Sequence, residues 1–94
     1  MSLGVLTLQL DIPGCMSLKE KRSRLKPLLA RLHREFNVSA AEMGHNDCWD
    51  EAILACALVS NDPNLTQAAL QKVTEWVEEY WPDVQIIQDG IELI

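Results

Sequence analysis

The chain has 94 residues, of which 48% are hydrophobic and 23% are charged, and its formal net charge is −6. This length and composition predict one domain spanning residues 1–94 and exclude a disordered chain. No apolar run reaches about 18 residues, so we expect no transmembrane helix and no membrane partner. Residues 1–6 lack a basic segment and a small-residue cleavage site, and therefore predict a strand rather than a signal peptide.

The positive charge is concentrated in one segment. Between Ser17 and Phe36, seven Lys or Arg residues face only Glu20 and Glu35, giving that segment a net charge of +5, while the rest of the chain carries −11. A globally acidic protein does not coat nucleic acid indiscriminately. A local basic segment could still bind phosphate, an RNA backbone or an acidic partner surface.

The chain opens with a strand and a helix. Residues 3–12 alternate between apolar and mixed positions, with Leu6, Leu8 and Leu10 on one side, and this period of two predicts a half-buried strand. Pro13 and Gly14 end it. Ser17 then caps a helix, and Glu20 three residues later completes a capping box.

We expect this helix to cover residues 18–35. Its apolar side chains fall on one face at about 100° per residue: Leu18, Leu25, Leu28, Leu29, Leu32 and Phe36. Pro27 lies on the opposite face, so either one bent helix runs through it or a helix begins near it. Lys21 falls inside the apolar stripe and must reach the end of the sheet or find a partner.

The start of this helix is the candidate anion- or RNA-binding site. Free backbone N–H groups and the positive end of the helix dipole make a helix start favourable for anions. The candidate residues are Ser17, Lys19, Lys21, Arg22, Arg24 and Lys26. The competing interpretation is a solvated amphipathic face whose lysine and arginine stems cover apolar surface.

Residues 37–44 predict a short strand at an edge of the sheet, and residues 45–50 predict a hairpin loop in which Trp49 packs against the body. His45, Cys48 and two carboxylates in this loop raise the question of a metal site. They are too close together in sequence to converge without a second segment, and no second segment is evident. We therefore expect no metal, no cofactor and no catalytic residue set.

Residues 51–60 form a nearly continuous apolar run, which predicts a central strand covered on both faces. Helices can cover one face, and the other needs a partner subunit or a ligand. A homodimer would pair open faces in which Val5 and Thr7 lie beside either Leu54, Cys56 and Leu58 or Ile53, Ala55 and Ala57. We assign the dimer face to Val5, Thr7, Leu54, Cys56 and Leu58, with the second set as the alternative.

A second helix starts with Asp62 as its cap and Pro63 at its first position, and Pro82 ends it. Its expected buried stripe is Leu65, Ala69, Val73, Trp76, Val77 and Tyr80. Residues 84–94 form a last strand, with a bulge expected near Gly90.

The three cysteines are odd in number and irregularly spaced, which favours a reducing cytoplasm over disulfides or a structural zinc site. Cys56 is expected in the core.

The order strand, helix, strand, strand, helix, strand is that of an α+β protein with a ferredoxin-like split βαβ sandwich. We expect a four-stranded antiparallel sheet with two helices on one face. The first and third strands, which are the most apolar, would be central.

Several of these residues also resemble a known family. They are Pro13-Gly14, the block Ser17-Leu18-Lys19-Glu20-Lys21-Arg22, Phe36-Asn37-Val38-Ser39, Ala41-Glu42, Asp47, Trp49 and Val59-Ser60-Asn61. This pattern is similar to that of the YlxP-like small bacterial proteins, domain of unknown function 503. His45, Cys48 and Pro27 do not belong to the shared pattern.

The resemblance implies a ferredoxin-like fold without an established activity. Genes of the family commonly lie beside those for transcription termination, translation initiation and ribosome-binding factor A, which implies an RNA- or ribosome-associated role. We therefore expect a cytoplasmic binding protein whose partner is RNA or a ribosomal particle. The alternatives are a homodimeric interaction module without nucleic-acid binding and, third, a small enzyme acting on an anionic substrate.

Overall fold

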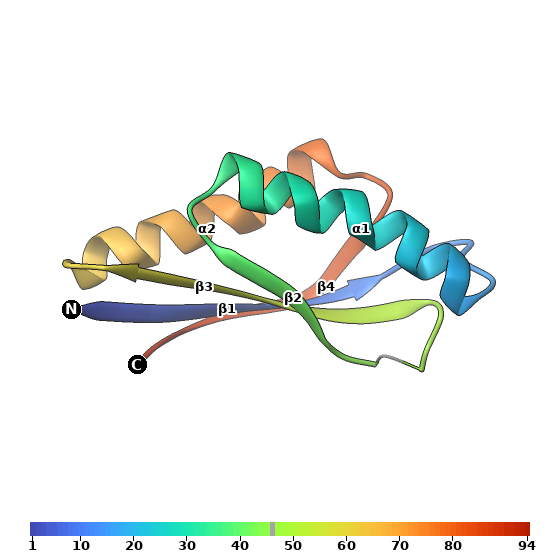
Figure 1. Cartoon of the computed structure of the whole chain (residues 1–94), viewed down its shortest axis with the longest axis horizontal. Helices are drawn as coiled ribbons and strands as arrows, with labels where there is room; N and C mark the ends of the chain where they lie inside the picture. Colours follow the sequence, from blue (N-terminus) through green and yellow to red (C-terminus); the bar gives the residue numbers. More distant parts are fainter. Residues whose placement is uncertain (46) are drawn as a thin grey trace.

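The computed structural model describes residues 1–45 and 47–94. Its elements, in chain order, are β1 (Ser2–Asp11), α1 (Leu18–Glu35), β2 (Ser39–Gly44), β3 (Glu51–Ser60), α2 (Pro63–Tyr80) and β4 (Gln85–Leu93). Figure 1 shows both helices on one side of the sheet, while the other side carries no helix. The structure thus confirms the predicted α+β fold, with an arrangement consistent with the ferredoxin-like one.

All neighbouring strands are antiparallel, and their order across the sheet is β2-β3-β1-β4. The two longest strands, β1 and β3, are central and pair along their whole length, from Ser2 opposite Ser60 to Asp11 opposite Glu51. The sequence prediction for the central strands is therefore confirmed. The edge position of β2 is also confirmed, although this strand begins at Ser39 instead of Asn37.

The core lies between the sheet and the helices. Leu6, Leu8 and Leu10 of β1 are fully buried there. Because Leu8 is opposite Leu54 and Leu6 is opposite Cys56, these β3 residues point to the same covered face.

This register corrects the predicted dimer face. Leu54 and Cys56 are fully buried beneath the helices, and the partly buried Leu58 packs against the same core. The alternative set, Ile53, Ala55 and Ala57, pairs with outward-pointing β1 residues and shares the uncovered face with Val5 and Thr7.

The helix α1 is continuous from Leu18 to Glu35, so Pro27 lies inside it and does not start it. The Ser17 side chain accepts a hydrogen bond of 3.1 Å from the backbone N–H of Glu20, as an N-cap does. Pro27 lies on the exposed side of the helix, where the carbonyl oxygen of Ser23, which lacks the usual N–H donor of residue 27, is not sealed in the core.

The buried face of α2 differs from the prediction. Leu65 and Tyr80 are 57% and 60% exposed, whereas two threonines, Thr66 and Thr74, are buried. Thr66 can be buried because its hydroxyl is 2.6 Å from the Ser60 hydroxyl and 3.3 Å from the Asp62 carbonyl oxygen. The cap and Pro63 lie at the helix start as predicted.

The bulge predicted near Gly90 is elsewhere. The register of β4 against β1 shifts between the pair Gln9–Gln88 and the pair Leu10–Ile86, so Ile87 is the extra residue. Gly90 itself pairs regularly with Thr7.

Candidate functional site

Lys21 is the largest fully buried side chain and is only 1% exposed. Its ammonium group donates hydrogen bonds to three backbone carbonyl oxygens: those of His45 (2.7 Å) and Cys48 (2.6 Å) in the loop between β2 and β3, and that of Glu51 (3.0 Å) at the start of β3. An ammonium group has three protons, and all three are used here. Lys21 therefore holds the loop against the start of α1 and has no N–H left for an external anion.

Glu42 supplies the counter-charge for this buried cation. Its Oε2 lies 2.8 Å from the Lys21 Nζ, and its side chain is 21% exposed. This contact is an ion pair without hydrogen-bond geometry, since Oε2 has no hydrogen-bond partner while the carbonyls take the three N–H groups. Charge and hydrogen-bonding capacity of Lys21 are thus both satisfied within the chain.

Arg24 also has a structural role. Its Nε and Nη2 donate to the two carboxylate oxygens of Asp83, each at 3.0 Å, and Nη2 also donates to the Asp83 carbonyl at 2.7 Å. Its Nη1 donates to the carbonyl oxygen of Pro13 at 2.8 Å. Donation of hydrogen bonds to the Asp83 carboxylate raises the pKa of the Arg24 guanidinium above its ordinary value. Arg24 joins α1 to the loops that follow β1 and α2.

The remaining cations of the predicted set are exposed. Lys19, Arg22 and Lys26 lie on the flank of α1 that borders the edge strand β2, and all three are exposed to solvent. His33 on the same flank marks this position, because its Nε2 accepts a hydrogen bond of 3.1 Å from the backbone N–H of Ala40 in β2. We call Lys19, Arg22 and Lys26 the basic flank.

The start of α1 lies next to the basic flank. The hydroxyl of Ser17 is occupied by the Glu20 N–H, and the Ser17 carbonyl accepts from the Cys15 thiol at 3.4 Å. Glu20 lies in the first helical turn, where its carboxylate is 3.6 Å from Arg24 Nη1. Ser17 thus acts as a cap, and the charge available to a ligand comes from the three side chains of the basic flank.

The negative charge collects at the opposite edge of the sheet. A groove of about 380 Å³ between α2 and β4 is lined by Glu75, Glu78 and Asp89. Because β2 and β4 are the two edge strands, the basic flank and this groove lie on opposite sides of the molecule. An anionic ligand is attracted to one edge and repelled from the other.

The described part of the loop after β2 shows no metal-binding arrangement. Among residues 1–45 and 47–94, no group of three or more His, Cys, Asp and Glu side chains is placed to hold a metal ion. Of the predicted loop, Asn46 lies outside the described residues. The prediction that Trp49 anchors the loop is wrong, because its side chain is 50% exposed and Lys21 provides the anchor.

Burial also determines the chemistry of the cysteines. Cys15 and Cys56 are buried, whereas Cys48 is partly exposed in the loop. Removal from water raises the pKa of the Cys56 thiol from its ordinary value of 9.0 to about 11, so this thiol is protonated at neutral pH. Cys56 is a core residue, as predicted.

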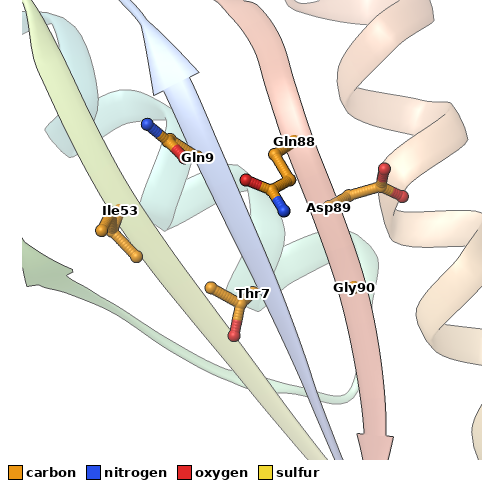
Figure 2. Close-up of a pocket in the computed structure, with 6 residues that line it drawn as sticks. All are labelled: Thr7, Gln9, Ile53, Gln88, Asp89 and Gly90. Atoms are coloured by element: carbon orange, nitrogen blue, oxygen red, sulfur yellow. The ribbon is translucent and has the colours of Figure 1, made fainter.

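The uncovered face of the sheet contains a shallow hollow of about 260 Å³ at its centre. Figure 2 shows Thr7 and Gln9 on β1, Ile53 on β3 and Gln88 on β4 around the bare backbone of Gly90. The aspartate in the same view, Asp89, points away from the others, towards α2. The sequence offered one signal for this hollow, a glycine within a predicted strand.

Neither helix is a membrane segment: in the part of the chain that the structure describes, no helix combines the length and apolarity needed to cross a bilayer.

Comparison with known proteins agrees with the resemblance seen in the sequence. The family model "Protein of unknown function (DUF503)" matches residues 3–89. The chain is 38% identical over 69 residues to "Uncharacterized protein YlxP" of Bacillus subtilis (strain 168), covering 73% of this chain and 74% of that protein.

Among solved structures, a mutant of SnoaB, described as a cofactor-independent oxygenase from Streptomyces nogalater, is similar with a TM-score of 0.47. The match has 10% sequence identity and covers 99% of this chain and 90% of that one. A likeness at this level carries no argument about function.

Proposed function

The chain belongs to the DUF503 family of proteins of unknown function, and on that premise we propose that it is a cytoplasmic protein that binds the phosphate backbone of RNA, free or in a ribosomal particle, through the basic flank of α1. The observation that carries the proposal is the division of the cations of α1. Lys21 and Arg24 are bound within the fold, whereas Lys19, Arg22 and Lys26 are exposed on one side.

The spacing of the basic flank suits a phosphate backbone. Positions 19, 22 and 26 lie three and four residues apart, so they follow one side of the helix over about 10 Å. This length is comparable to two or three phosphates of a stacked strand, at roughly 3.4 Å each. Each cation can therefore approach a different phosphate of the same strand.

The sheet offers no support for reading bases. The four strands contain no Phe, Tyr or Trp, so the uncovered face cannot stack bases as sheet-based RNA-binding domains do. The aromatic rings of Phe36, Trp76 and Trp81 instead pack on one another beside the helices. Binding through backbone charge alone is tolerant of sequence and strongly dependent on salt.

The test is fluorescence anisotropy of a labelled single-stranded RNA of mixed sequence, titrated with the wild-type protein and the triple variant K19A/R22A/K26A over a series of salt concentrations. We expect the triple variant to bind at least about tenfold more weakly and the slope of log K against log salt to become shallower by about 2, the value for three lost phosphate contacts on a single strand.

Two controls separate charge from a general effect of substitution. The charge-preserving variant K19R/R22K/K26R should bind nearly as the wild type does, and K72A, which removes the one lysine of α2, should have little effect. Equal affinity of the wild type and the triple variant would refute the proposal. Absence of wild-type binding at low salt would favour the rival function, a homodimeric interaction module without nucleic-acid binding.

A further inference from the structure

We propose that the uncovered face of the sheet binds a second copy of the same chain, with the hollow over Gly90 receiving a side chain of that copy. This surface is separate from the basic flank, because the helices lie on the other side of the sheet (Figure 1). The inference starts from the reasons for which the chain contains glycine.

Three of the four glycines have a reason within the chain itself. A Cβ at Gly4 would lie 2.5 Å from Thr66 Cγ2, closer than any real contact. A Cβ at Gly44 would lie 3.0 Å from the Ile53 side chain. Gly14 has a φ of +75°, a conformation that favours glycine.

Gly90 has neither of these reasons. A Cβ built there would meet nothing within 4 Å, and its φ is not in the left-handed region. A glycine inside a strand weakens the strand, and it often marks a place where another chain or a ligand approaches closely. The space over Gly90 is therefore open to a group from outside the described chain.

The polar groups around the hollow suit a second copy of the same surface. Thr7 contributes a hydroxyl, and Gln9 and Gln88 contribute amides (Figure 2). Each of these groups can both donate and accept hydrogen bonds, so the set can pair with an identical set across a twofold axis. A patch of carboxylates or ammonium groups could not do this.

The charges on this face are confined to its ends. Asp11 and Glu51 lie opposite each other at one end, and Glu92 pairs with Val5 near the other end. In Figure 2 the carboxylate of Asp89 points away from the hollow. Two copies can thus approach through the neutral centre in spite of the net charge of −6, whereas a nucleic acid finds no cation among the residues described on this face.

The uncovered face has about the area of a small interface. After Glu51 at the start of β3, its outward positions are Ile53, Ala55, Ala57 and Val59, all apolar, although a strand facing water normally alternates with polar residues. The four strands contain 35 residues, and at about 3.3 Å along a strand and about 4.8 Å between strands one face of the sheet covers about 550 Å² before the relief of the side chains is counted. Stable interfaces bury about 600 Å² or more per partner, so the whole face would be used.

The test is sedimentation equilibrium of the full chain at concentrations from about 1 to 100 μM. We expect the wild type to form a dimer of twice the 10.6 kDa chain mass. The variant G90V fills the hollow, and because the overpacking occurs twice in a symmetric dimer, its dissociation constant should rise about 100-fold or more. Its thermal unfolding midpoint under monomeric conditions should equal or exceed that of the wild type, since Val favours strands.

A second variant tests whether the loss of the dimer in G90V is only a local effect of valine. Thr7→Glu places two like charges across the proposed axis and should also give a monomer with unchanged circular dichroism. The control A30L enlarges an exposed side chain on the solvent side of α1 and should remain dimeric. A wild type that is monomeric throughout this range, or a dimer that persists in both G90V and T7E, would overturn the proposal.

Discussion

Lys21 in α1 donates a 2.6 Å hydrogen bond to the carbonyl oxygen of Cys48, 27 residues further along the chain. The same ammonium group binds two other carbonyls and the Glu42 carboxylate, so one side chain joins the helix start, β2 and the loop before β3. A lysine in a basic helix ordinarily lies at the surface, where it can contact a ligand or a partner. In this fold Lys21 is buried, so it does not contribute to the surface charge of α1.

Replacement of Lys21 by Met should therefore destabilise the fold strongly. The variant keeps an apolar stem of similar length but leaves Glu42 without its counter-charge and three carbonyls without a donor. Breaking a buried pair from one side costs about 3–5 kcal/mol. Urea denaturation followed by circular dichroism measures the change.

Glu42→Gln is the matched comparison for this prediction. This substitution breaks the same ion pair from the other side, but Lys21 keeps all three carbonyl acceptors when Glu42 is replaced, so the loss in the free energy of unfolding should be smaller than that of Lys21→Met. A K21M variant as stable as the wild type, or less affected than E42Q, would contradict the structural role of Lys21. In the RNA titration, by contrast, any folded K21M protein should bind as the wild type does.

Arg24→Ala should cost less than Lys21→Met. It removes the two-point contact with Asp83 and the bond to the Pro13 carbonyl, but Asp83 is half-exposed, so water replaces part of what is lost. We expect a loss of about 1–2 kcal/mol in the free energy of unfolding. Arg24→Lys should recover little of it, because an ammonium cannot reproduce the planar two-point geometry. Full recovery in the lysine variant would show that charge alone is sufficient.

The contrast between these residues shows what the sequence could reveal. Helical periodicity correctly places Lys21 in the apolar stripe, which predicts that it needs a partner. The partners themselves are backbone carbonyls, which carry no residue-specific signal. Trp49 was the more obvious anchor by type, yet it is 50% exposed.

The second helix shows a different limit. Counting apolar residues places Leu65 and Tyr80 on the buried face, but the true face contains Thr66 and Thr74. The local hydrogen bonds of Thr66 at the helix start allow its hydroxyl to be buried, so a polar residue can lie on this face. Likewise, an almost uniformly apolar β3 gives no indication of which alternate residues face the helices, and only the register with β1 decides it.

The folded chain should become less stable at alkaline pH because the Cys56 thiol ionises. Its pKa in the folded chain is about 11, above the ordinary value of 9.0, so the unfolded chain releases this proton first. The contribution is fully present below the ordinary pKa of 9.0, which applies to the unfolded chain. It is lost as pH rises through the folded value, up to about 2–3 kcal/mol.

The measurement is the free energy of unfolding of the wild type and Cys56→Ala from pH 7 to 11. Other groups titrate in this range, so the difference between the two curves is the informative quantity. It should shrink as pH rises, because the variant lacks the thiol whose ionisation favours unfolding. A difference that stays constant with pH would show that the Cys56 thiol is as accessible to water as an unfolded one.

Gly4→Ala should destabilise the contact between β1 and α2. The added methyl carbon would lie 2.5 Å from Thr66 Cγ2 and 2.9 Å from Leu70 Cδ1. Thr66 cannot turn aside freely, because its hydroxyl is bound to Ser60 and to the Asp62 carbonyl. The helix must shift instead, at a cost of about 1–3 kcal/mol. Thermal denaturation of the variant gives the loss directly.

The double variant Gly4→Ala/Thr66→Ser identifies the cause of that loss. Serine keeps the hydroxyl that bonds to Ser60 and lacks the methyl group that meets the new Cβ, so the double variant should regain part of the stability lost in Gly4→Ala. The coupling of the two substitutions should be favourable by about 0.5–1.5 kcal/mol. Strict additivity would mean that the loss comes from the backbone of β1. Gly90→Ala on the neighbouring strand, where a Cβ meets nothing within 4 Å, should leave the fold of the monomer intact or stabilise it.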